Sequence, residues 1–216
     1  MTVRPRGTRM YSLRLSLVCF VVACSYGAPS KHPTTRIAFG SCNKQYEPQP
    51  LWQEILRLQP LDLWVWGGDN IYADRRRSFF ERAYLYLQGD DRAKVMFESA
   101  TQSKLRADYQ HQLSHPDYAQ LVRNIPVVGI WDDHDYGIND GNKNFADKSA
   151  SKQEFLDFIG ASKNDPRRSQ DGVYDAYTLG SGNHTVKVIL LDVRFNRDPW
   201  PHQKVRAMLN RMGSCG

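Results

Sequence analysis

Three short polar clusters hold the side chains of this 216-residue sequence that are suited to chemistry. They read Ser41-Cys42-Asn43, Gly68-Asp69-Asn70-Ile71-Tyr72 and Trp131-Asp132-Asp133-His134-Asp135. Together they offer a thiol, several carboxylates, amides, a phenol and an imidazole. An apolar core does not accept such a set unpaired, because a buried carboxylate without a partner either destabilises the fold or changes its protonation state. Bound cations would pair all of these groups, so the clusters indicate a metal site.

Each member of the clusters also has an ordinary explanation. Taken alone, Cys42 reads more readily as a small buried apolar side chain, Asp69 as a turn residue after glycine, and His134 as a surface or capping histidine. The third cluster is harder to explain in this way. Three aspartates within four residues surround its imidazole, and such like charges are costly side by side unless something positive binds there.

The elements that must position these clusters follow a β-α-β pattern. Apolar segments predict strands over 36–42, 61–66 and 125–131, and helical spacing predicts a helix over 51–59 that ends at Pro60. Each polar cluster begins where one of the three strands ends. In an open parallel sheet, ligands bind beyond the carboxyl ends of the strands. We therefore expect the three clusters to converge in space.

The remaining segments complete an α/β pattern. Residues 78–124 predict two or three helices, in which Tyr84, Tyr86 and Leu87 read as packing residues. The other expected elements are a polar loop over 132–144, a helix over 149–159 and strands over 173–179 and 185–192. The run Arg75-Arg76-Arg77 is interpreted as a solvated face rather than as an attractor for an anionic substrate.

The joint set of motifs resembles the alkaline phosphatase D (PhoD-like) family. Gly68-Asp69-Asn70-Ile71-Tyr72 is similar to the G-D-x-x-Y element of dinuclear metallophosphoesterases, and Leu190-Leu191-Asp192-Val193-Arg194 matches a further motif of the family. The resemblance runs from about Arg36 to Pro199. It implies an α/β metallophosphatase fold, an α/β/β/α sandwich of two central sheets flanked by helices, of which this sequence would carry only the N-terminal part.

The same resemblance implies a metal-dependent phosphoric ester hydrolase, in which a hydroxide that bridges Fe³⁺ and Ca²⁺ attacks a phosphate ester. Asp69 would bridge the metals, Cys42 and Tyr72 would ligate the ferric ion, and Asp133 would hold the second metal. His134 would sit beside the substrate and protonate the leaving alcohol. The full set of expected site residues is His134 and Arg194 as catalytic groups, Cys42, Asp69, Tyr72, Asp133 and Asp192 as metal ligands, and Asn43, Asn70 and Asp135 as substrate-binding groups.

The resemblance stops after Pro199, where the family continues to a Gly-Asp-x-His element that supplies further ligands. We interpret residues 28–199 as the N-terminal part of a PhoD-like domain and residues 200–216 as a divergent basic tail. The alternative to an active phosphatase is therefore a truncated chain whose motifs do not complete a catalytic site. Two further questions stay open: whether the substrate is a monoester or a diester, and whether zinc or manganese replaces iron and calcium.

Residues 1–27 resemble a secretory signal peptide. The segment holds four arginines and no acid, its apolar run from Leu13 to Ala23 is broken only by Arg14 and Ser16, and small residues follow the run. The run is shorter than the roughly 20 residues that a membrane-spanning helix needs. We expect export through the secretory pathway to the exterior or an endomembrane lumen. If the segment stays uncleaved, it would associate the chain with a membrane.

The net charge of +6 is concentrated at the ends of the chain. Residues 28–193 hold 20 basic and 22 acidic side chains. A surface that binds nucleic acid needs many phosphate contacts from a basic face of the folded body. The charge distribution therefore argues against a nucleic-acid partner, and the expected partner is a small phosphate ester.

Overall fold

The computed structural model describes residues 35–200. The predicted signal segment 1–27 and residues 201–216 of the predicted tail lie outside the described residues. Within residues 35–200, no helix combines the length and apolar character needed to cross a membrane.

A three-stranded parallel sheet lies at the centre of the fold, as the β-α-β pattern predicts. Its strands are β1 (Ile37–Gly40), β2 (Leu63–Gly67) and β5 (Val127–Ile130), in the order β1-β2-β5. The first helix, α1 (Leu51–Arg57), connects β1 to β2. Because both strand pairs are parallel, the carboxyl ends of all three strands lie at one edge of the sheet.

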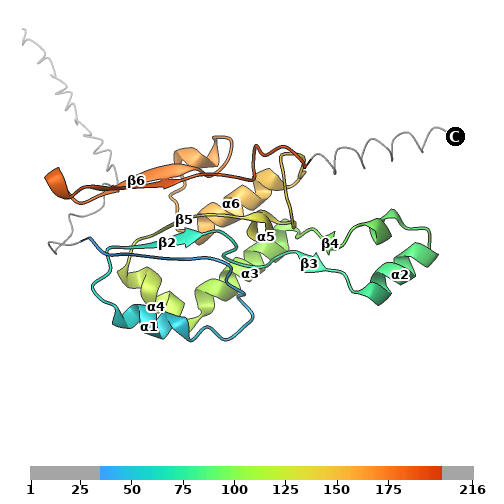
Figure 1. Ribbon diagram of the computed structural model, residues 1–216, viewed down its shortest axis with the longest axis horizontal. Helices are drawn as coiled ribbons and strands as arrows, with labels where there is room; N and C mark the ends of the chain where they lie inside the picture. The colour runs from blue at the N-terminus through green and yellow to red at the C-terminus, as the bar shows by residue number, and fades with distance from the viewer. Residues whose placement is uncertain (1–34, 201–216) are drawn as a thin grey trace, which may run out of the picture.

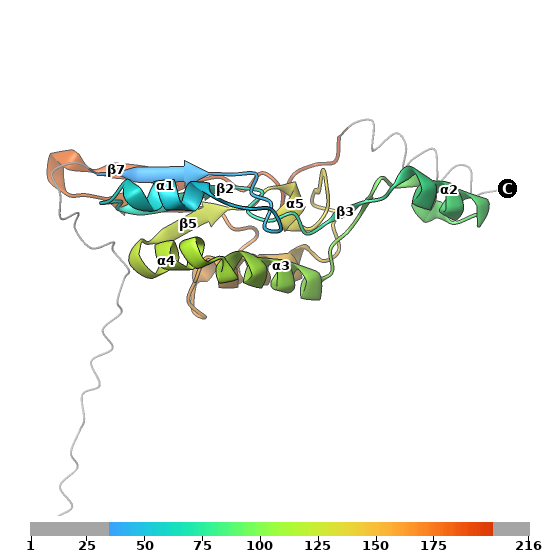
Figure 2. The ribbon, with the colours of Figure 1, turned by 90° about the horizontal axis from the view of Figure 1, so that it is seen from below.

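Helices cover one face of this sheet (Figures 1 and 2). Besides α1, they are α3 (Gln102–Ser114), α4 (Pro116–Asn124) and α6 (Lys148–Phe158). The core beneath them is aromatic: the Trp52 ring packs edge-on against the rings of Trp64 and Trp66, with centroids 5.0 and 5.5 Å away. The Trp66 indole nitrogen donates a hydrogen bond to the buried Tyr118 hydroxyl at 2.9 Å. The polar atoms of this aromatic pair are thus satisfied inside the core.

A β-hairpin covers the opposite face of the sheet. It consists of β6 (Asp175–Leu179) and β7 (Val186–Leu190), which pair antiparallel as a separate two-stranded sheet. Leu190 of β7 packs against Leu63 and Val128 of the central sheet. Figure 1 shows the resulting layers of hairpin, parallel sheet and helices. The mixed α/β architecture predicted from the sequence is confirmed.

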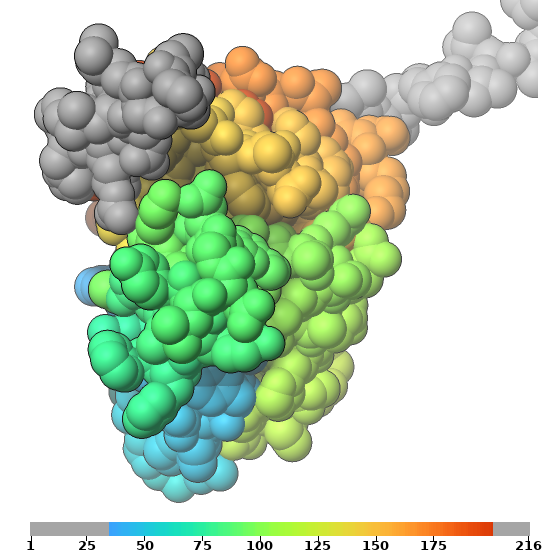
Figure 3. Space-filling model, turned by 90° about the vertical axis from the view of Figure 1, so that its right-hand side faces the viewer, coloured from blue at the N-terminus to red at the C-terminus, as the bar shows by residue number. Residues whose placement is uncertain are grey.

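An arm projects from the body immediately after the second polar cluster. Its base is a short antiparallel ribbon of β3 (Arg75–Arg76) and β4 (Phe97–Glu98), and its tip holds α2 (Phe79–Leu87) and a 3₁₀ helix, η1 (Asp91–Lys94). Figures 1 and 2 show α2 set apart from the other helices, and Figure 3 views the molecule with the arm in front of the body. The region predicted as two or three helices therefore also contains this ribbon.

Two local predictions are wrong. Tyr84, Tyr86 and Leu87 are exposed rather than packed, at 64%, 76% and 80% of their surface, because α2 lies on the arm, away from the body. The predicted polar loop over 132–144 contains a short helix, α5 (Asp133–Tyr136). Two more 3₁₀ turns, η2 (Pro166–Arg168) and η3 (Gly182–His184), precede and connect the hairpin strands.

Candidate metal centre

The loops that follow β1 and β2 are joined by backbone hydrogen bonds. The amide of Cys42 donates to the carbonyl of Gly68 at 3.1 Å, and the amide of Asn43 donates to the carbonyl of Asp69 at 2.8 Å. Cys42 and Asp69 both have left-handed backbone conformations, with φ of 57° and 50°. Such conformations are uncommon outside glycine and concentrate at functional sites. They bring the thiol and the carboxylate to the same edge of the sheet.

Gly68 lets the loop after β2 approach the loop after β5. Its φ is 103°, and a Cβ at this position would lie only 2.8 Å from the Cβ of Asp132. A side chain there would be strained by its backbone conformation and would push the two loops apart. The glycine is therefore a condition for bringing the second and third polar clusters together.

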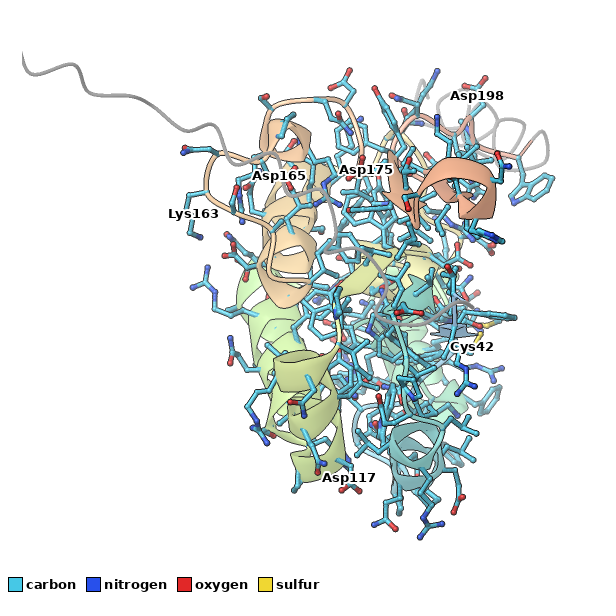
Figure 4. The ribbon with its side chains drawn as sticks, turned by 90° about the vertical axis from the view of Figure 1, so that its left-hand side faces the viewer. Cys42, Asp117, Lys163, Asp165, Asp175 and Asp198 are labelled. Atoms are coloured by element: carbon cyan, nitrogen blue, oxygen red, sulfur yellow. The ribbon has the colours of Figure 1, made fainter. Side chains whose placement is uncertain are left out.

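Asp69, Asp133 and His134 form a cluster in which ligand atoms of all three lie within 4.8 Å of one another. Cys42 and Tyr72 join it through Asp69 Oδ2, which lies 3.9 Å from the Cys42 sulfur and accepts a hydrogen bond from the Tyr72 hydroxyl at 3.3 Å. Figure 4 labels Cys42 at the edge of the molecule, in agreement with its exposure to solvent. The predicted convergence of the three clusters is present.

The electrostatics of this cluster favour a cation. Burial raises the pKa of Asp69, and the charge of Asp133 adds to this effect, although His134 opposes it. Burial and the charge of Asp69 likewise raise the pKa of the Tyr72 phenol. A bound cation would favour the ionised forms of Asp69 and Tyr72 and so lower both pKa values. Thiolate and phenolate suit a ferric ion and carboxylates suit a hard cation such as calcium, so the donor set fits the metals that the resemblance implies.

Asp74 is a site residue that the sequence reasoning missed. Its Oδ1 lies 2.6 Å from Nδ1 of His134, and its Oδ2 accepts the backbone amide of Asn139 at 2.8 Å. The His134 ring also stacks on Tyr72, with centroids 4.3 Å apart. These contacts fix the orientation of the imidazole. The available signal was a carboxylate two residues after Tyr72, at the end of the second cluster.

Arg194 reaches the cluster from the segment after β7. Its Nε donates to Asp132, and its Nη2 lies 3.5 Å from Asp133. Its Nη1 is buried, with no hydrogen-bond partner among residues 35–200. Asp133 is further held by the backbone amide of Asp140, which donates to Oδ2 at 2.6 Å. Arg194 therefore lies beside the predicted ligand Asp133.

The three predicted substrate-binding residues point into the protein. Asp135 and Asn70 have no exposed surface, and Asp135 Oδ2 accepts hydrogen bonds from the backbone and side chain of Asn70 at 3.1 and 2.6 Å. The Asn43 amide donates to the carbonyl of Asn70 and to Gln112. These contacts lock the loops together. All three side chains are engaged in these hydrogen bonds, and their contacts with a substrate stay predictions.

Asp192 lies outside the cluster. Its Oδ2 accepts the backbone amide of Val173 at 2.9 Å, and its Oδ1 accepts the amides of Arg194 and Phe195 at 2.8 and 2.9 Å. A Cβ on Gly172 would lie 2.6 Å from Asp192 Oδ2. The carboxylate thus anchors two loops, which is a different use from the metal ligation predicted for it.

Comparisons with known proteins agree with the motifs. The model of the PhoD-like phosphatase family matches residues 37–213 and so extends past Pro199 into the predicted tail. A solved structure described as "Structure of PhoD" matches with a TM-score of 0.57 and 20% sequence identity. The alignment covers 81% of this chain and 34% of that chain. No curated protein matches the sequence.

At this identity the solved structure shows the fold alone, which is metallophosphatase-like as predicted. The chain spans about a third of that protein's length. The family match covers most of the sequence, and it includes all three polar clusters and the segment that holds Arg194. The chain therefore belongs to the PhoD-like phosphatase family.

Proposed function

We propose that this chain is a metal-dependent phosphoric ester hydrolase whose metal ions bind around Asp69. One observation supports the proposal above the others: Asp69, Asp133 and His134 meet within 4.8 Å at the carboxyl edge of a parallel sheet. Cys42 and Tyr72 approach the same carboxylate. The membership of the chain in a phosphatase family supports phosphate esters as the substrates.

Asp69 would help to hold both ions, because both of its oxygens face other members of the cluster. Oδ2 faces the thiol and the phenol, and Oδ1 faces the backbone amide of His134 at 3.3 Å. Cys42 and Tyr72 would hold one ion and Asp133 the other. When bound, the metals would supply positive charge that stabilises phosphoryl oxygens, and they would make an attacking oxygen nucleophilic at neutral pH.

His134 would hold and deliver the proton that the leaving alcohol needs. Burial lowers its pKa, but the hydrogen bond to Asp74 and the charges of Asp74 and Asp69 outweigh burial, so its pKa lies above the ordinary value. A histidine whose pKa is raised keeps its proton to higher pH, which suits general acid catalysis. Arg194 would keep Asp133 oriented through its contact with that carboxylate.

The identities of the metals and of the substrate belong to the same proposal. We assign Fe³⁺ to the side with Cys42 and Tyr72 and Ca²⁺ to the side with Asp133, on the preferences of thiolate, phenolate and carboxylate ligands. The substrate is a small phosphate ester. Aryl phosphate monoesters and bis-aryl diesters, assayed in parallel, decide between the two ester classes.

The test uses the purified full chain, its metal content and its turnover of aryl phosphates. We expect Asp69→Asn to lose both metal and turnover, and His134→Ala to lose turnover. The matched controls are Asp62→Asn, whose carboxylate accepts the amide of Arg36 near the start of β1, and His184→Ala in an exposed turn. Unchanged rates in both site variants would refute the assignment.

The alternative is a chain that binds metal weakly and does not turn over substrate. It is favoured by the small number of donors: among residues 35–200, Asp69, Asp133 and His134, with Cys42 and Tyr72 beside them, offer five donors to two ions, whereas a single zinc or calcium site takes about four to eight ligands. Metal analysis separates the two functions. About two ions per chain would support the hydrolase, and less than one would support the alternative.

We further propose that the chain is exported through the secretory pathway. The proposal rests on the arginines and apolar run of residues 1–27. Expression of the full chain in a secreting cell, followed by N-terminal sequencing of the protein recovered outside, would show removal of the segment. Retention inside the cell with Met1 in place would contradict export.

A further inference from the structure

The arm carries an apolar surface that the described part of the chain leaves uncovered. No residue of α2 is buried. Phe80, Tyr84 and Leu87 follow one another at the spacing i, i+4, i+7 and so lie on one face of the helix. They are 82%, 64% and 80% exposed. We define these three residues, with Phe79 and Tyr86 beside them, as the arm surface.

The arm surface is large for an unpaired patch. Phe79 and Tyr86 are also mostly exposed, and with η1 they line a cavity of about 550 Å³. Since a large aromatic side chain offers about 150–250 Å² of surface, the four mostly exposed aromatic side chains alone present roughly 600 Å² of mostly apolar area, to which Leu87 adds. The largest apolar patch of an ordinary monomer is about 300–600 Å² and is often functional.

The charges of the arm indicate what this surface meets. Residues 75–98 contain six basic and four acidic side chains, and each acid is paired within the arm. The pairs are Glu81 and Glu98 with Arg75, Asp90 with Arg92, and Asp91 with Lys94. Arg76 is exposed and has no ion pair among the described residues. The net charge of the arm is therefore positive, and Arg76 carries part of it in β3, at the base of the arm.

We propose that the arm surface docks on a lipid bilayer that carries anionic phosphate headgroups. Phenylalanine, tyrosine and leucine on one side of a helix, on an arm with a net positive charge, are suited to the boundary between acyl chains and headgroups. The arm also projects from the body (Figures 1 and 2), with α2 set apart from the sheet and the other labelled helices.

A second copy of the chain fits this surface less well. Pairing arm against arm would bring two positively charged arms together, which like-charge repulsion opposes. A bilayer avoids this repulsion, because its anionic headgroups complement the positive charge of the arm.

The experiment measures flotation of the full chain with vesicles of phosphatidylcholine and phosphatidylserine, and with vesicles of phosphatidylcholine alone. The arm variant replaces Phe80, Tyr84 and Leu87 with serine. We expect it to bind the anionic vesicles at least tenfold more weakly. A second variant, Arg76→Gln, leaves the helix residues in place, and we expect several-fold weaker binding to anionic vesicles with little change on phosphatidylcholine.

The matched control replaces Tyr46, Leu51 and Leu58 with serine, because these side chains are also exposed but lie on or near α1. We expect it to bind like the parent. Equal binding of the parent, the arm variant and Arg76→Gln would overturn the proposal, including the case in which residues 1–27 hold the chain on the vesicle. Light scattering supplies the other decisive outcome: if the arm variant instead converts a dimer to a monomer, the surface is an interface between copies.

Docking of the arm surface on a bilayer does not depend on phosphatase activity. None of the substituted residues belongs to the metal cluster, so turnover of a soluble aryl phosphate should be the same in all variants if the chain is a hydrolase. Vesicle binding without turnover would leave the docking surface standing and remove only the proposed function.

Discussion

The substitution Asp192→Ala tests whether this carboxylate anchors loops or binds metal. Three backbone amides, those of Val173, Arg194 and Phe195, donate to it at 2.8–2.9 Å. Hydrogen bonds to a charged group contribute about 1.5–3 kcal/mol each, and the contributions of neighbours are not additive. We therefore expect Asp192→Ala to lower the free energy of unfolding by about 3–4 kcal/mol.

Asp192→Asn should lower it by about 1–2 kcal/mol, because an amide keeps one acceptor oxygen and loses the charge. Its oxygen can still accept the amides of Arg194 and Phe195, but its NH₂ group would face the amide of Val173, and two donors repel. Urea unfolding followed by tryptophan fluorescence measures both effects. Trp131 is a reporter at this position, since its ring is parallel to that of Phe195 with centroids 6.5 Å apart.

The control is Asp198→Asn, whose exposed salt bridge with Lys143 should contribute less than about 1 kcal/mol. Metal content is measured on the same samples under folding conditions. A loop anchor predicts lower stability with metal content retained by the folded Asn variant. Normal stability combined with loss of a metal ion would refute the structural reasoning and restore Asp192 as a ligand.

Three further outcomes are expected. Asp74→Asn should reduce kcat about 10–100-fold with little change in KM, because the ring of His134 loses its anchor while substrate contacts remain. A fall in kcat accompanied by a rise in KM of the same size would contradict this role. Metal content after dialysis should fall as the pH is lowered. The fall should begin above the pH range in which aspartate usually titrates, because burial raises the pKa of Asp69 in the metal-free protein. Retention of metal at low pH would exclude Asp69 as a ligand. Tyr118→Phe should cost about 1–3 kcal/mol in chemical denaturation, since it leaves the Trp66 indole donor buried without a partner, and an unchanged unfolding midpoint would show that the pair is not needed.

Local patterns in the sequence were sufficient for much of the fold. Short apolar segments bounded by glycine and proline predicted β1, β2 and β5, and helical spacing predicted α1 and α6. The predicted convergence of the polar clusters is also present, because parallel strands place their carboxyl ends at one edge. Whether a short segment forms a strand depends largely on the pattern of a few neighbouring residues, which a single sequence contains.

The arm was not predictable in this way. Its helix α2 has the composition of a packed helix, and Tyr84, Tyr86 and Leu87 look like core residues until the β3–β4 ribbon carries them away from the body. Exposure is a property of what else lies nearby, and a local pattern does not contain that information.

The sequence predicted some roles of the polar site residues, whereas other roles became clear only from the tertiary structure. Residue types and spacing identified the three polar clusters, and the family resemblance selected Cys42, Asp69, Tyr72, Asp133 and His134 within them. These residues come together because each follows a strand end or lies within a few residues of one. Spacing did not distinguish carboxylates that face the cluster from those, such as Asp135 and Asp192, that accept backbone amides. Nor did it identify Asp74 as the partner of the imidazole. Such assignments depend on the directions of side chains across loops far apart in sequence, so only the tertiary structure decides them.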